Sequence, residues 1–145
     1  MTAVIPYLCA SDAAGAIEFY KKAFGATEVL RMTDRKGKIG HAEITIGGVR
    51  VMVADEWREG GVRSPQTLGG TPVSIVLEVD DVDTVFDQAI AAGATVERAV
   101  TDQSYGERSG WLVDPFGHRW SVGTRTEDLS KDDLRERVQP DYDVS

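Results

Sequence analysis

Cysteine is nearly absent from this chain of 145 residues, and so are long apolar runs. Cys9 is the only cysteine, which excludes an intrachain disulfide and the disulfide-stapled folds of small secreted proteins. No stretch approaches the roughly 20 apolar residues that a membrane-spanning helix needs. The first residues also lack the basic and apolar segments of a signal peptide. The sequence therefore predicts a cytoplasmic protein without a membrane partner.

Positive charge is scarce as well. The chain holds 16 lysine and arginine residues against 24 aspartate and glutamate residues, for a net charge of −8. Such a chain repels phosphate backbones, so nucleic acid is not an expected partner. The nucleophile elbow, the phosphate-binding P-loop and the dinucleotide-binding glycine motif are all missing. What remains is an ordinary globular composition in a chain long enough to bury a core.

The first part of the chain alternates between strand and helix patterns. Residues 4–10 form a short apolar strand, and Ser11 and Asp12 offer an N-cap for a helix that Gly25 ends. Three more strands follow, so the first 56 residues predict one βαβββ unit. These last strands cover residues 27–32, 39–46 and 49–54.

The same order of elements returns in the second half. Gly93 lies 68 residues after Gly25, and the same shift brings Asp12 to Asp80. A shared cap, helix and glycine stop in one order is typical of an internal repeat. We therefore predict a single domain over residues 1–124, followed by a charged tail. Its parts are module one (1–56), a linker (57–71), module two (72–124) and the tail (125–145).

Two segments of the chain are predicted to be irregular. Residues 57–71 are rich in glycine, arginine, serine and proline without periodicity, and residues 102–108 form a loop between two short strands. In the tail, Ser130 and Asp133 are spaced as in a capping box and predict the start of one short helix. The tail is either a solvated appendage or a cover for the neighbour's surface in a dimer.

Four stretches contain motifs that can be compared with known families. They are a helix with its glycine stop (16–26), a strand with its Gly-Gly hairpin (40–48), the start of the second half (77–83) and the turn Asp-Pro-Phe-Gly (114–117). In this order they resemble the vicinal oxygen chelate superfamily, which includes glyoxalase I, bleomycin-resistance proteins and extradiol dioxygenases. The resemblance spans about residues 1–124, which is all of the chain except the tail.

The resemblance implies an α+β fold of two tandem βαβββ modules, each a curved mixed sheet with its helix on the convex side. The concave sides together form a cup for small molecules. Proteins of this family are usually homodimers, either domain-swapped or side by side. A lone module cannot cover its own concave face, which also favours pairing.

Metal-using members of the family place His, Glu or Gln ligands at four positions in the cup, on the first and last strand of each module. By position, these places fall here on Ile5, Met52, Ser74 and Ser121. None of these is an ordinary ligand for zinc, nickel, manganese or iron. Shifting the alignment by one or two residues assembles no better set. We therefore expect no metal site of the usual kind and no cofactor.

His41 and Glu43 leave one unconventional metal site open. Alternation over residues 39–46 puts both on the cup face of one strand, about 7 Å apart. A catalytic metal needs three converging ligands, and no third is evident. The alternative is a hydrogen-bonded polar pair that faces a ligand or water.

Strand alternation gives the cup a polar lining of mixed charge, which a core face would not tolerate. This lining predicts either a ligand site with fixed donors and acceptors or internal ion pairs. Such pairs would join Arg50 or Arg119 with Glu43 or Glu78. Cys9 also faces the cup, where a lone cysteine is expected to act as a small apolar residue.

Loops at the rim add aromatic rings, from Trp57, Tyr105 and Trp111, on which flat ligands can stack. In the loop 102–108, Arg108 is placed near the cup mouth, where it either holds a carboxylate or phosphate of the ligand or forms a surface salt bridge with Glu107 or Asp114. The predicted ligand-binding residues are Tyr7, His41, Glu43, Arg50, Met52, Ser74, Tyr105, Arg108, Trp111 and Ser121.

These observations favour a metal-free homodimer that binds and sequesters a small organic molecule, as bleomycin-resistance proteins do. A second hypothesis is a divergent metal-dependent lyase, isomerase or dioxygenase that uses His41, Glu43 and a third group. A third is an interaction module whose cup is vestigial. The sequence does not name the ligand.

Overall fold

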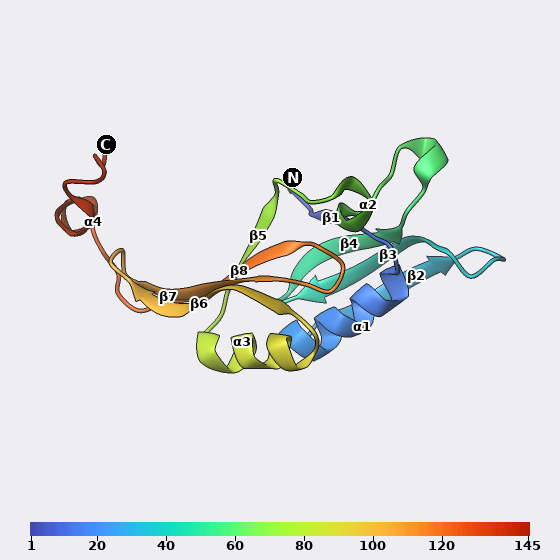
Figure 1. The fold of residues 1–145 in the computed structure, drawn as a ribbon, viewed down its shortest axis with the longest axis horizontal. Coiled ribbons are helices and arrows are strands. Elements are labelled where there is room, and N and C mark those ends of the chain that lie inside the picture. The colour runs from blue at the N-terminus through green and yellow to red at the C-terminus, as the bar shows by residue number, and fades with distance from the viewer.

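The computed structural model describes all 145 residues of the chain. It contains two four-stranded sheets, with strand orders β1-β4-β3-β2 and β5-β8-β7-β6. This confirms the predicted α+β fold of two tandem modules (Figure 1). Module one contains β1 (Tyr7–Ala10), α1 (Ala13–Phe24), β2 (Thr27–Thr33), β3 (Ile39–Ile46) and β4 (Val49–Asp55). Module two contains β5 (Ser74–Glu78), α3 (Val82–Ala91), β6 (Thr95–Gln103), β7 (Glu107–Val113) and β8 (Arg119–Arg125).

The helix boundaries follow from the residues that the sequence placed there. Asp12 caps α1 by accepting a hydrogen bond of 3.1 Å from the backbone N–H of Gly15, and Asp81 caps α3 through Thr84. Gly25 ends α1 with φ at +67°, in the left-handed region that residues with a Cβ atom rarely adopt. Asp12 and the first glycine stop are confirmed, whereas the cap of α3 is Asp81, one residue after the Asp80 that the repeat indicates.

One face of each sheet carries the apolar side chains. In β3, Ala42, Ile44 and Ile46 are buried, while the residues between them are not. The helices α1 and α3 cover this face of the two sheets and pack against each other (Figure 1). Trp120 of β8 is 1% exposed and belongs to the same cluster. Burial of this face therefore builds one core shared by both modules.

Asp114 joins the two modules inside this core. Its Oδ2 accepts hydrogen bonds from the Tyr20 hydroxyl of α1 at 2.6 Å and from the Trp120 indole N–H at 2.9 Å. Its Oδ1 accepts two backbone N–H groups of its own turn. Burial and the charge of Asp114 raise the pKa of Tyr20 well above its usual value, so this hydroxyl remains a donor. Nearby, a ring nitrogen of His118 lies 2.8 Å from the carbonyl oxygen of Cys9 in β1.

The predicted loop over residues 102–108 is wrong. β6 continues through Gln103 and β7 begins at Glu107, so that only a tight turn separates the two strands. Polar residues dominate this stretch, and their low strand propensity does not predict that it joins a sheet. The antiparallel pairing of β6 with β7 supplies the backbone hydrogen bonds that hold them extended.

The linker is also more regular than its composition predicts. It contains a 3₁₀ turn, η1 (Arg58–Gly60), and a short helix, α2 (Pro65–Leu68). Ser64 caps α2 and Pro65 occupies its first turn, where a missing N–H costs nothing. At the other end of module one, β1 begins at Tyr7 instead of residue 4, because Pro6 has no N–H for the ladder.

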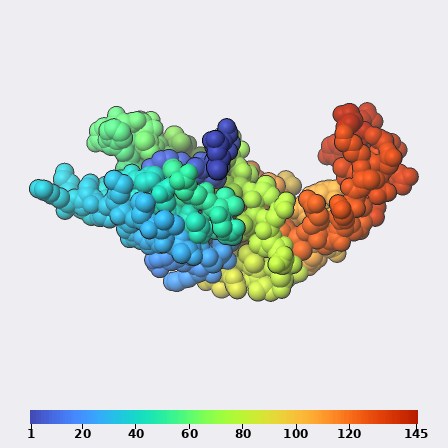
Figure 2. Space-filling model, turned by 180° about the vertical axis from the view of Figure 1, so that it is seen from behind, coloured from blue at the N-terminus to red at the C-terminus, as the bar shows by residue number.

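The sheet faces opposite the helices are open. The molecule is elongated, and the linker and the C-terminal tail rise on the same side at opposite ends, with the N-terminus between them (Figure 2). The tail contains α4 (Lys131–Val138), which begins with the predicted Ser130–Asp133 capping box. No helix of the chain combines the length and the apolar composition that crossing a membrane would require.

Candidate functional site

The open face of module one carries a cluster of polar and aromatic side chains. The Tyr7 hydroxyl of β1 lies 2.8 Å from Nδ1 of His41 in β3, and the two rings meet edge to face at a centroid distance of 5.4 Å. Next along β3, Glu43 accepts a hydrogen bond of 3.2 Å from Arg50 of β4. Met52 lies between them, paired in the ladder with both Tyr7 and Glu43. Strand pairing thus brings together the five residues predicted for this module.

The Glu43–Arg50 contact confirms one of the two ion pairings that the sequence suggested. Arg119 forms the other ion pair with a different partner, Glu97 of β6, in a bidentate contact with distances of 2.8 and 3.1 Å. A third hydrogen bond joins Arg119 to the hydroxyl of Ser74 at 3.1 Å. The carboxylate of Glu97 has a pKa below its usual range because Arg119 donates to it.

The open face of module two is built around this arginine. Its guanidinium lies 5.1 Å from the ring centroid of Trp111, which places the predicted Trp111 and Ser74 in one cluster. Ser121 is paired with Trp111 in the β7–β8 ladder and is 7% exposed. Tyr105 lies apart from this cluster, in the β6–β7 turn, where it lines a cavity together with Leu129 and Leu134 of the tail.

The predicted place of Arg108 at the cup mouth is wrong. This residue lies in β7 on the same face as Leu112, which is buried under the helices. Its guanidinium donates to Asp83 of α3 at 2.9 and 3.0 Å and to Asp102 at 3.3 Å. The structure thus shows a salt bridge, but with Asp83 and Asp102 instead of the expected Glu107 or Asp114, because the regular strand turns the side chain away from the open face.

The places where metal-using relatives hold their ligands are split between the two sheets. Met52 is paired with Tyr7 in one sheet, and Ser121 with Val76 in the other. No group of three or more His, Cys, Asp or Glu side chains is placed so that it could hold a metal ion. His41 and Glu43 are engaged with Tyr7 and Arg50, so the residues of one chain do not fit a catalytic metal.

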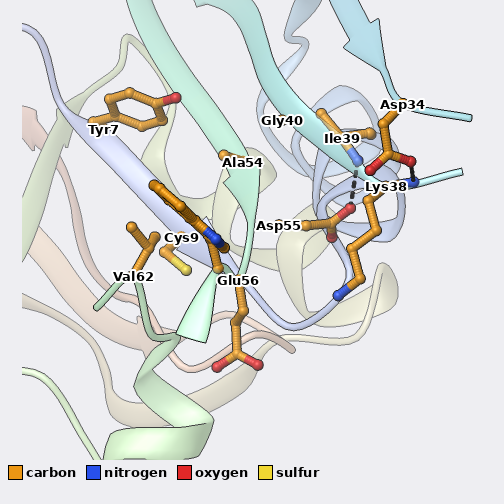
Figure 3. A pocket seen from close by; sticks show the side chains of 11 residues that line it. Tyr7, Cys9, Asp34, Lys38, Ile39, Gly40, Ala54, Asp55, Glu56 and Val62 are labelled. Atoms are coloured by element: carbon orange, nitrogen blue, oxygen red, sulfur yellow. Dashed lines mark hydrogen bonds between the residues drawn. The ribbon is translucent and has the colours of Figure 1, made fainter. Parts of the chain in front are cut away.

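A cavity of about 520 Å³ opens at one end of the module one face. Figure 3 shows Tyr7, Cys9 and Val62 on one side of it, with Asp34 and Lys38 on the other. Its size is that of a site for a small organic molecule. The lining residues are Tyr7, Cys9, Asp34, Lys38, Ile39, Gly40, Ala54, Asp55, Glu56, Trp57 and Val62.

Backbone hydrogen bonds to aspartates fix the shape of this cavity. Asp55, the last residue of β4, accepts the N–H groups of Ala13 and Ile39, both at 2.7 Å. Asp34 accepts the N–H groups of Lys36 and Lys38 at 2.8 and 3.0 Å. Asp55 thus connects β4 to α1 and β3, and Asp34 holds the β2–β3 turn.

Trp57 reaches the cavity from the linker, which sequence patterns describe as irregular. Its backbone N–H and C=O bond reciprocally with Val62, each at 2.9 Å. Hydrogen bonds from Thr67 and Ser64 lower the pKa of Glu56 to about 2, so this carboxylate stays charged and anchors the start of the loop. Trp57 was expected at the rim, whereas Lys38 and Asp34 were missed because they lie in a charged turn that resembles any solvated hairpin.

The thiol of Cys9 stays neutral at the base of the cavity. Burial raises its pKa, and the negative charges of Glu56 and Asp55 raise it further. This excludes an activated nucleophile, in agreement with the apolar role expected from the sequence. The carboxylates of Glu56 and Asp55 are therefore close enough to act on this point of the cavity.

The fold and this face define a protein of two βαβββ modules with an open, polar cup surface. The model of the Glyoxalase/Bleomycin resistance protein/Dioxygenase superfamily matches residues 3–122, and the chain belongs to this superfamily. The family resemblance seen in the sequence is thereby confirmed.

Two mycobacterial proteins are similar to the chain over most of its length. An uncharacterised protein from Mycobacterium bovis is 45% identical over 136 residues, which are 92% of this chain and 90% of that protein. One from Mycobacterium tuberculosis is also 45% identical and is covered to 80%. The names of these two relatives state no activity.

Solved structures share the fold. TioX from a Micromonospora species is 28% identical with a TM-score of 0.68, over 86% of this chain and 99% of that one. A protein from Pseudomonas aeruginosa reaches a TM-score of 0.70 at 22% identity, over 88% of this chain and all of the other. The second likeness concerns the fold alone.

Proposed function

We propose that this protein binds and sequesters a small organic molecule, such as an antibiotic or another natural product, in the cytoplasm and without a metal. The observation that carries the proposal is the cavity of about 520 Å³ at the end of an open face. That face offers a tyrosine–histidine pair and an ion pair as fixed polar groups, while its metal-ligand places are occupied by other residues. Such a site suits recognition better than metal chemistry.

The proposed binding unit is a homodimer. The open face exposes apolar side chains on strands of both sheets: Tyr7 of β1 is 55% exposed, Met32 of β2 62% and Val76 of β5 61%. Apolar groups on an uncovered sheet face are the ordinary mark of an interaction surface. Pairing two copies would cover these faces and enclose the cup between a module of each chain.

Isothermal titration of the purified protein against a panel of aromatic natural products tests the proposal. At least one compound is expected to bind with a stoichiometry of one per site. The double variant Tyr7→Phe/His41→Gln, which removes the polar pair, should weaken that binding. If no compound of the panel produced a heat of binding while the protein was folded, the proposal would be contradicted.

A second candidate is a metal-dependent lyase, isomerase or dioxygenase, for which the superfamily provides precedent. The specific observation in its favour is that Tyr7 engages Nδ1 of His41 and leaves Nε2 of the ring for a ligand. The additional ligands would have to come from a second chain. Elemental analysis of protein purified without chelator decides between the two candidates, since a stoichiometric divalent metal lost in the His41→Ala variant would favour the enzyme.

A further inference from the structure

Trp57 forms an aromatic wall of the cavity, and its ring is exposed to solvent but held in position. Trp57 is 63% exposed, and its ring lies directly on Gly60, where an added Cβ atom would be 2.3 Å from the ring. The reciprocal bonds with Val62 fix the backbone at the same point. An exposed indole held this firmly presents one face to a ligand without a large loss of side-chain entropy on binding.

The opposite side of the cavity carries negative charge. Asp34 and Asp55 accept hydrogen bonds only from neutral backbone N–H groups, and neither is in an ion pair. Glu56 is compensated by Arg58, at 3.2 Å. Two full carboxylate charges therefore act on the cavity.

Lys38 is the only cation in the lining, and it also has no ion-pair partner. Its flexible side chain can turn its ammonium group toward water, whereas the aspartates are fixed by their backbone hydrogen bonds. One cation against two fixed anions leaves the cavity negative. Burial raises the pKa of the Cys9 thiol, and the charges of Glu56 and Asp55 raise it further, which agrees with this sign.

We propose that the cavity selects a planar aromatic ligand that carries a positive charge, its ring stacked on Trp57 and its charge toward Asp34 and Asp55. The inference rests on the proposed small-molecule function and adds the chemical class of the ligand. Stacking and cation–π attraction act on the same ring face, so that a flat cation gains from both.

Three acridines of nearly equal shape test this inference at pH 8: proflavine, a cation; acridine, which is uncharged; and acridine-9-carboxylate, an anion. Their binding to the whole protein is measured by fluorescence titration at low salt. Proflavine should bind about tenfold or more tightly than the carboxylate, with one molecule per site. Equal affinities, or a preference for the anion, would overturn the inference.

Matched variants separate the cavity from adsorption to an acidic surface. Trp57→Ala should weaken proflavine binding about tenfold, and Trp57→Phe much less. Tyr142→Ala removes an equally exposed aromatic ring that lies outside the cavity and should change nothing. Proflavine binding that Trp57→Ala leaves unchanged would place the dye elsewhere and contradict the inference.

Lys38→Gln tests whether the charges of the lining act on the bound dye. Removing the one cation should raise proflavine affinity about two- to fivefold and lower that of the carboxylate by a similar factor. The opposite result would show that the charges of the lining do not act on the bound dye, which would contradict the inference. Binding of a natural product together with equal affinities for the three acridines would support the proposed function and overturn only the inference about ligand charge. The two proposals can therefore fail separately.

Discussion

Asp114 shows how a single buried carboxylate can hold two modules together. It is 3% exposed and accepts four hydrogen bonds, one of them from Tyr20 in the other module. Its four donors satisfy its lone pairs, which is the condition for keeping a charged group inside a core.

Asp114→Asn should destabilise the protein by about 2–4 kcal/mol, because the new NH₂ group faces donors and leaves buried N–H and O–H groups unpaired. Tyr20→Phe removes one of these bonds and should cost about 1 kcal/mol. Urea unfolding followed by circular dichroism measures both. An Asp114→Asn variant as stable as Tyr20→Phe would show that the carboxylate is not the junction described here.

Glu56 gives a prediction for pH dependence. Its pKa of about 2 lies below its ordinary value of 4.5, so its contribution to the loop is present above pH 4.5 and is lost as pH falls toward 2. The Ser64 amide, which donates to Glu56 at 2.8 Å, should report this in its NMR shift, with a midpoint near 2. A midpoint near 4.5 would contradict the assignment, and Glu56→Gln should abolish the titration.

At the scale of elements, the helices are short, and their cap residues determine where they begin and end. α1 has only 12 residues, which is marginal for an isolated helix, and Asp12 and Gly25 define its two ends. Burial of its apolar face against the sheet supplies the remaining stability.

Gly25→Ala should therefore destabilise the protein by about 1 kcal/mol, through the strain of φ at +67° alone, since nothing lies within 4 Å of the added methyl group. Gly40→Ala is the matched control, because that position has equal free space and no positive φ. Differential scanning calorimetry compares the two. Equal melting temperatures would mean that α1 can end without a left-handed residue.

At the scale of the whole molecule, the open sheet faces are the surface on which the proposed dimer depends. Figure 2 shows that the arms formed by the linker and the tail rise from the same side of the body. An elongated chain with its polar and apolar cup residues on that side has a large surface available to a second copy.

Val76→Asp should convert the proposed dimer to a monomer without unfolding the chain, since the side chain is exposed on the open face of β5. Val49→Asp introduces the same charge at a similarly exposed position on the opposite face of its sheet and should leave the dimer intact. Sedimentation velocity reads the outcome. A wild-type protein that sediments as a monomer at all concentrations would exclude the pairing.

Local patterns in the sequence sufficed for the repeat, the helix caps, the buried and open faces of β3 and the family. These features depend on residue periodicity and on glycine or aspartate at fixed places, which act over a few residues. The same patterns placed His41 and Glu43 correctly on one face.

Only the tertiary structure decided the partners of Arg108 and Arg119, the order in the linker, and the cavity between Trp57 and Lys38. The two arginines bind carboxylates 22 and 25 residues away, and the cavity brings the linker beside the β2–β3 turn. The linker is held by contacts over three to eight residues, which its irregular composition does not indicate. The free energies of these contacts depend on where other parts of the folded chain lie, which no local pattern encodes. A helix cap or an alternating strand, in contrast, is determined by a few neighbouring residues.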